Sequence, residues 1–187
     1  MGHKFAEIAF TSSVCAVQEA QGSRRSYQKL AQGEDYNDVL GDAEAEFIGA
    51  RDSFYMATVS ETGWPYVQHR GGPIGFVRTL DTRTLGFADF RGNRQYVTVG
   101  NLRTDDRAAL FFMDYPNRLR LKVLGRVTLI EPGSERLAEL EIPDYGARVE
   151  RGFIVRVEAF DWNCSQHITP RYTVEQLREL SGPEPPG

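Results

Sequence analysis

The stretch FADFRGNRQYVTVGNLRTDDRAALFF, residues 87–112, decides the fold of this chain. It begins at the end of an apolar strand, passes through a polar loop around Gly92, and continues as a helix of poor propensity over 93–102. Helix N-termini present free N–H groups and positive partial charge, and arginines add charge-assisted hydrogen bonds. The two arginines of this loop therefore predict an anion site, with a solvated polar turn as the alternative.

Strands are predicted on both sides of this stretch. Runs of aromatic and β-branched residues bounded by turn residues indicate strands, and one of them is interrupted by Gly71-Gly72-Pro73. Counting that interrupted run as one strand, the predicted set is 54–59, 66–80, 85–88, 108–113, 119–130 and 152–157. Six strands so close together in sequence predict a mainly β fold, an antiparallel barrel with flanking helices.

Helices are predicted mainly at the two ends of the chain. Capping residues and glycines indicate helices over 12–20, over 23–32 and from Asp42 onward, and a short helix is expected over 134–140. Thr173-Val174-Glu175-Gln176 is a capping box for a last helix. We expect a helical extension over 1–46, a barrel over 47–160, and a loop, short helix and tail over 161–187.

Composition narrows the class of protein. The 187 residues are 41% hydrophobic and 26% charged, with a formal net charge of -4, so the overall field does not attract nucleic acid or anionic membranes. An apolar run of about 20 residues, as a membrane span needs, is missing, and the N-terminus does not resemble a signal peptide. Cys15 and Cys164 are expected to be reduced thiols of a cytoplasmic protein.

Further basic residues lie near the quoted stretch. His69, Arg70 and Arg78 lie on the interrupted strand, and if its two arms pair, they would converge with the two arginines of the loop. The alternative is a set of unrelated surface charges. Arg120 and Lys122 alternate with leucines, a pattern that is typical of any two-faced strand.

The late segment DWNCSQHITPRY, residues 161–172, is rich in side chains that bind ligands. The rings of Trp162 and His167 suit stacking against a planar ligand, and Gln166 adds a polar group. Cys164 and His167 provide one pair of metal ligands at most, so a metal site is not predicted. Nucleophilic Cys–His chemistry by this pair is an alternative.

Taken in order, these elements resemble the pyridoxamine 5′-phosphate oxidase-related flavoproteins, which are FMN-binding split barrels. The similarity covers residues 47–157. Its best marker is the quoted stretch, followed by LRLKVLGRVTLIE, residues 119–131, with a glycine and a basic residue near its middle. The resemblance implies a split β-barrel and a homodimer that holds FMN at its interface.

The resemblance also implies roles for individual residues. Arg94 corresponds to a basic residue that binds the FMN phosphate, and Arg120 lies where the family often has a glutamine facing the flavin ring. The complete set of expected cofactor-binding residues is His69, Arg70, Gly71, Arg78, Asp89, Phe90, Arg91, Asn93, Arg94, Gln95 and Arg120. The residues expected beside the ring or substrate are Trp162, Gln166 and His167.

The expected function is a flavin-dependent oxidoreductase in which FMN takes a hydride from a nicotinamide or a small organic donor. The Trp-plus-Arg signature with which the true oxidases hold pyridoxamine phosphate is not recognisable, so oxidation of vitamin B6 is not expected. One alternative is a non-catalytic module that stores or senses flavin or haem. Another is a reductase that uses the deazaflavin F420.

Overall fold

The computed structural model describes residues 2–33, 36–163 and 165–181. Its helices are α1 (Lys4–Ala9), α2 (Ser12–Ala20), α3 (Arg24–Ala31), α4 (Asp42–Gly49), α5 (Val97–Asn101), α6 (Glu135–Ala138) and α7 (Val174–Ser181). Its strands are β1 (Ser53–Val59), β2 (Pro65–Gly71), β3 (Val77–Asp81), β4 (Thr84–Phe90), β5 (Arg107–Asp114), β6 (Leu119–Ile130) and β7 (Val149–Trp162).

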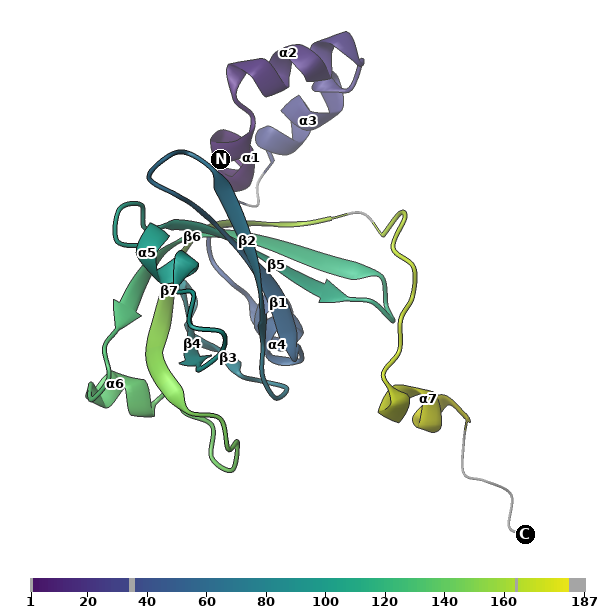
Figure 1. Cartoon of the computed structure of the whole chain (residues 1–187). Helices are drawn as coiled ribbons and strands as arrows, with labels where there is room; N and C mark the ends of the chain where they lie inside the picture. Colours follow the sequence, from purple (N-terminus) through teal and green to yellow (C-terminus); the bar gives the residue numbers. More distant parts are fainter. Residues whose placement is uncertain (1, 34–35, 164, 182–187) are drawn as a thin grey trace.

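The strands form one antiparallel sheet in the order β2-β1-β5-β6-β7-β4-β3 (Figure 1). The mainly β prediction is confirmed, but the described sheet has seven strands where the sequence predicted six. The difference lies at the interrupted strand, because β2 and β3 occupy opposite edges of the sheet. Gly75 has φ +82, and a Cβ at Gly72 would lie 2.7 Å from the Phe76 ring, so the chain turns between them.

The sheet curls so that strands far apart in its order share one core. The Phe54 ring of β1 lies 5.1 Å from the Phe87 ring of β4 and 4.9 Å from the Phe112 ring of β5, between ring centroids. Phe87 in turn stacks on Phe153 of β7 at 4.9 Å. These four phenylalanines are fully buried. The two ends of the sheet therefore face each other, and this brings the end of β2 beside the end of β4.

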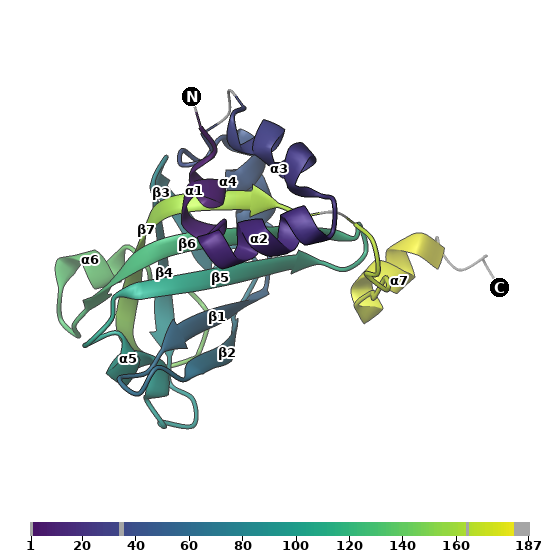
Figure 2. The same ribbon diagram turned by 90° about the horizontal axis from the view of Figure 1, so that it is seen from above.

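Five of the seven described helices lie at three places around the barrel. α1 packs on β7, and α2 and α3 lie beyond it on the outer side of the sheet (Figures 1 and 2). α4 closes one end, where Glu44 accepts a hydrogen bond from the Trp162 indole at 2.7 Å. α7 ends an extended arm away from the barrel (Figure 2), and its capping box forms as predicted between Thr173 and Gln176. None of the described helices combines the length and the apolar character that crossing a bilayer requires.

The structure differs from the sequence prediction in the extents of α5 and β7 and in one additional helix, α1. The helix expected over 93–102 is confined to α5, because Arg94 and Tyr96 have φ values of 62 and 54 and keep residues 93–96 in a loop. β7 extends beyond the predicted 152–157 and includes Trp162. α1 was not predicted; the buried His3 caps its N-terminus, and the His3 ring accepts a hydrogen bond from the Ala6 amide.

Candidate anion-binding site

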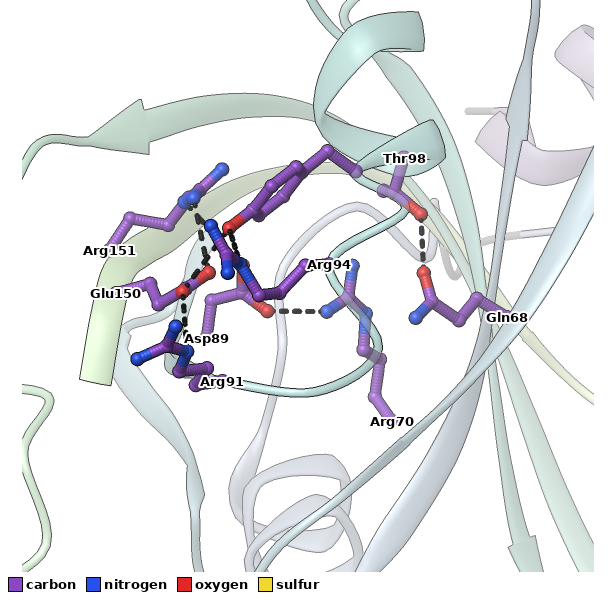
Figure 3. A network of polar contacts seen from close by, with 9 residues as sticks. Gln68, Arg70, Asp89, Arg91, Arg94, Thr98, Glu150 and Arg151 are labelled. Carbon is purple, nitrogen blue, oxygen red and sulfur yellow. Dashed lines mark hydrogen bonds and ion pairs between the residues drawn. The ribbon is translucent and has the colours of Figure 1, made fainter. Parts of the chain in front are cut away.

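A polar pocket lies where the end of β2, the end of β4 and the loop before α5 meet (Figure 3). Strand alternation determines which side chains reach it. Arg70 pairs with Phe54, and Gln68 pairs with Met56, both of which are buried, so these two polar side chains share the inner face of β2. His69 between them points to the outer face, where its ring contacts Tyr55 at 5.6 Å between centroids.

Asp89 is the buried centre of this pocket. Arg70 donates a hydrogen bond of 2.5 Å to one carboxylate oxygen, and the Arg151 Nε lies 3.6 Å from the other. Burial raises the pKa of the Asp89 carboxyl above its ordinary value, and the two arginines oppose that shift. Among the described residues, the buried Nε of Arg70 has no hydrogen-bond partner. This orphaned donor is what a bound anion would satisfy.

The loop before α5 forms the outer wall of the pocket. Arg94 donates from Nε to the Tyr96 hydroxyl at 3.3 Å, and that hydroxyl donates to Glu150 at 3.2 Å. Arg91 lies 3.7 Å from the same carboxylate, and Arg151 lies 3.4 Å from its second oxygen. Arg94 and Tyr96 both have left-handed backbone, and through the Tyr96 hydroxyl their side chains reach Glu150 on β7.

The charges of this described network leave a positive excess. It contains four arginines, Arg70, Arg91, Arg94 and Arg151, and two carboxylates, Asp89 and Glu150 (Figure 3). The formal excess of two positive charges equals the charge of a phosphate monoester dianion. A site of this kind attracts an anion within a protein whose net charge is -4.

The structure brings together part of the predicted cofactor set. The predicted residues that line the pocket are Arg70, Asp89, Phe90, Asn93 and Arg94. Arg91 adjoins it through Glu150, and His69 and Gly71 line a neighbouring small cavity that shares Arg70 and Asp89 with this pocket. Gln95 is exposed, and its backbone amide donates to the Asn93 side chain at 3.1 Å. Gln95 does not line the pocket.

Arg78 is a correction to the prediction. Its guanidinium donates to the backbone oxygens of Glu139 and Glu141, the latter at 2.9 Å, and so ties β3 to the segment after α6. The two arms of the interrupted run do not pair, because β2 and β3 lie at opposite edges of the sheet. Because its guanidinium binds the backbone oxygens of Glu139 and Glu141 and does not line the pocket, Arg78 does not converge with Arg91 and Arg94.

The residues expected beside the ring lie elsewhere. Trp162 packs edge-on against Phe47 at 4.7 Å and binds Glu44, so it joins α4 to the barrel and lines neither this pocket nor the second one described below. Arg120 and His167 line that second pocket on the outer face of the sheet. Gln166 is exposed. Cys164, on which the alternative of nucleophilic Cys–His chemistry depends, lies outside the described residues.

Sequence reasoning missed several residues of the pocket. The missed lining residues are Gln68, Tyr96, Thr98, Val99 and Glu150, and Arg151 was missed as the ion-pair partner of Asp89 beside the pocket. Strand alternation could have identified Gln68, because in a strand it shares a face with Arg70. In the structure its side-chain oxygen accepts a hydrogen bond from Thr98 at 2.9 Å. Glu150 and Arg151 carried no comparable signal. β7 starts earlier than its apolar pattern indicates, and pairing with β4 places these residues beside Asp89.

The profile of the pyridoxamine 5′-phosphate oxidase family matches residues 40–162, which is more than half of the chain. The chain therefore belongs to that family. This range includes all seven strands and every residue of the pocket described above. No curated protein matches at a significant level.

Solved structures agree with this fold. HupZ of Group A Streptococcus superposes with a TM-score of 0.54 at 16% identity, covering 71% of this chain and 99% of HupZ. An FMN-binding protein from Syntrophomonas wolfei superposes with a TM-score of 0.50 at 10% identity, covering 78% of this chain and 97% of that one. At such low identity, these similarities establish the split-barrel fold alone.

Proposed function

We propose that this protein binds FMN through the pocket at Arg70, Asp89 and Arg94 and works as a flavin-dependent oxidoreductase. The carrying observation is the excess of two positive charges around the orphaned Nε of Arg70. Membership of the oxidase family and the FMN-binding relative from Syntrophomonas wolfei support flavin as the ligand that brings the phosphate.

The pocket suits the phosphate end of this cofactor. Its cavity is about 50 Å³, which holds several water-sized groups, whereas a cavity for a whole drug-sized ligand takes roughly 300–1000 Å³. The Arg70 and Arg94 guanidinium groups would bind the phosphate oxygens, and Thr98 and Asn93 add neutral polar groups. The three fused rings would then lie outside the cavity, on the protein surface.

A flavin ring on the protein surface has to be shielded from solvent, and the outer face of the sheet carries apolar surface on which a second chain could pack. Two adjoining hollows of about 540 and 390 Å³ share Ala57, Ala109 and Leu124, and their described lining is mostly apolar. Val67 on the same face is 60% exposed. Exposed apolar surface of this kind is typical of protein interfaces. We propose that a second copy of the chain packs here and covers the cofactor.

Bound flavin supplies hydride and electron transfer. The chain would hold the phosphate with its arginines and orient the cofactor from that end. Asp89 fixes the Arg70 guanidinium by a hydrogen bond, so the cation is preorganised before the ligand arrives. None of these roles requires a nucleophilic side chain.

The absorbance spectrum of the purified protein is the first test of the proposal. We expect flavin bands in the visible blue, and reduction of the bound flavin by NADH, NADPH or a small organic donor under anaerobic conditions. A Soret band would show that the bound cofactor is haem and not flavin. Flavin that no donor reduces would indicate storage or sensing, and specific uptake of F420 in place of FMN would redirect the proposal to that cofactor.

Substitution of Arg94 by glutamine tests where the phosphate binds. Because a charge-assisted hydrogen bond is lost, we expect the dissociation constant for FMN to rise about tenfold or more. Riboflavin, which has no phosphate, should be affected much less. Arg103→Gln is the matched control, since Arg103 is exposed just beyond α5 and does not line the pocket. Unchanged FMN affinity in folded Arg94→Gln would place the phosphate elsewhere.

A further inference from the structure

A second pocket of about 310 Å³ opens on the outer face of the sheet, at the end of the β5–β6 hairpin and under the C-terminal arm. The floor comes from strands β1, β5 and β6, and the arm beyond β7 provides the remaining wall. The described residues that line it are Tyr55, Phe111, Met113, Tyr115, Arg120, His167, Ile168, Thr169 and Arg171.

The walls of this second pocket are aromatic. Tyr55 and Phe111 are paired neighbours on β1 and β5, and Tyr115 follows β5. Burial, together with the neighbouring Tyr55 side chain, raises the pKa of Tyr115 above its ordinary value. The Tyr115 phenol therefore stays neutral at physiological pH. Flat, uncharged walls of this kind suit a planar ligand.

The charged groups of the second pocket are all basic. Arg120 and Arg171 contribute cations, His167 contributes an imidazole, and the described lining contains no carboxylate. This composition contrasts with the first site, where Asp89 and Glu150 balance part of the positive charge. The second pocket thus offers positive charge that the lining itself does not neutralise, within a protein of net charge -4.

The two arginines of the second pocket have different surroundings, and each can bind an anion. The Arg171 guanidinium lies over the Tyr115 ring at 4.8 Å, so the aromatic wall positions it. The Nε of Arg120 is buried and has no hydrogen-bond partner among the described residues. A buried donor left without a partner costs stability, and a ligand oxygen would remove that cost.

From these contacts we propose that the second pocket binds a planar organic anion, specifically an aromatic carboxylate. The ring would lie against Tyr55, Phe111 and Tyr115, and the carboxylate would meet the planar forks of Arg120 and Arg171. The Tyr55 ring of this pocket contacts the ring of His69, the residue before Arg70. The inference rests on the proposed function in one respect, because it makes this anion the reaction partner of the flavin.

The test uses the purified full chain with its native cofactor content, and benzoate as the probe. Binding is followed by ligand-observed NMR titration, with benzamide as a neutral probe of the same shape. We expect benzoate to bind and benzamide to bind about tenfold more weakly, the scale of one charge-assisted hydrogen bond. Equal affinity for the two probes, or no binding of benzoate, would overturn the proposal.

Arg171→Gln and Arg120→Gln locate the binding site. Each substitution should weaken benzoate binding about tenfold, because one charge-assisted hydrogen bond to the carboxylate is lost. Arg171 is exposed on the arm, so its substitution leaves the barrel core untouched. The control is Arg118→Gln, an exposed arginine in the same β5–β6 turn that is not part of the lining. Benzoate affinity that survives both pocket substitutions contradicts the assignment.

FMN content is measured in each of these variants. The proposal requires that Arg120→Gln and Arg171→Gln keep their flavin while losing benzoate affinity. Loss of flavin from either variant would show that the second pocket is part of the flavin-binding site. That result would overturn the proposal. Protein that binds benzoate through these arginines but never takes up flavin would instead sustain the anion pocket and refute the proposed function, so the two failures are distinguishable.

Discussion

Asp89 is an unusual residue for an anion site, because a carboxylate repels the ligand that its neighbours attract. Its contact with Arg70 explains its presence, since the 2.5 Å hydrogen bond holds a guanidinium that is largely buried. Burial outweighs the two arginines and raises the pKa of Asp89 above its ordinary value of 3.8. The folded state therefore binds this proton more tightly than the unfolded state does, and the stability of the protein depends on pH.

Asp89→Asn tests that pKa direction. Between pH 3.8 and the raised pKa, the folded protein holds more protons, so the wild type loses stability relative to the variant as the pH rises. The loss should approach about 1.4 kcal/mol for each unit by which the pKa is raised. Urea unfolding of both proteins between pH 3.5 and 7, about the range that carboxyl groups titrate, measures it. A wild type that gains on the variant with rising pH would refute the direction.

Asp105→Asn provides a control of opposite sign. Hydrogen bonds from Arg107 lower the pKa of Asp105 to about 2. The stabilising contribution of Asp105 is therefore present above pH 3.8 and is lost as the pH falls toward 2. The Asp105 side chain is 23% exposed and its partner Arg107 is 71% exposed, so solvent screens this ion pair and its effect on stability should be small. Relative to the variant, the wild type should lose stability in acid and not on the neutral side.

At the scale of elements, β6 depends on a glycine at its bulge. The register between β6 and β7 shifts at Leu124/Gly125, and a Cβ at Gly125 would lie 2.6 Å from the Arg156 backbone oxygen. Gly125→Ala should therefore destabilise the fold by about 1–3 kcal/mol, the usual cost of overpacking. Thermal and urea unfolding of the variant measure the effect.

Gly100→Ala is the matched substitution in α5. A Cβ at Gly100 would meet nothing within 4 Å, and the backbone there is helical. Alanine should stabilise this position by about 0.5–1 kcal/mol, because it restricts the unfolded chain. If the two substitutions had equal effects, the close approach of β6 to β7 would not be the reason for glycine at 125.

Elements and their order were largely predictable, whereas their ends were not. The apolar runs of β1, β5 and β6 extend over nearly the predicted residues, because burial on one face imposes alternation on the sequence itself. α5 is shorter than predicted, since the left-handed residues Arg94 and Tyr96 have no local signature. Strand alternation also split the predicted His69-Arg70 pair between the two faces of β2.

At the scale of the whole molecule, the proposed dimer is tested at Val67. This side chain lies on the outer face of β2 and is 60% exposed in the single chain, so Val67→Glu should leave the fold intact. A buried charge at an interface is costly, and we therefore expect the variant to be monomeric and to lose FMN. Sedimentation velocity and flavin absorbance measure the two effects. Val39→Glu, exposed outside the apolar hollows, is the control.

Two results would contradict this part of the proposal. A wild-type chain that sediments as a monomer with bound flavin would show that no second copy is needed to cover the ring. A Val67→Glu variant that stays dimeric would place the interface on another face. Loss of dimer and flavin in the Val39→Glu control as well would indicate general destabilisation in place of a lost interface.

The sequence by itself determined the family, the mainly β class, the antiparallel strands and the presence of arginines in the loop after β4. It could do so because alternation, turn residues and local motifs are written into neighbouring positions. The tertiary structure alone decided that β2 and β3 part to opposite edges, that Arg78 leaves the site, and that Glu150 and Arg151 join it. The curl of the sheet creates these contacts between residues far apart in the chain, and no local pattern encodes them.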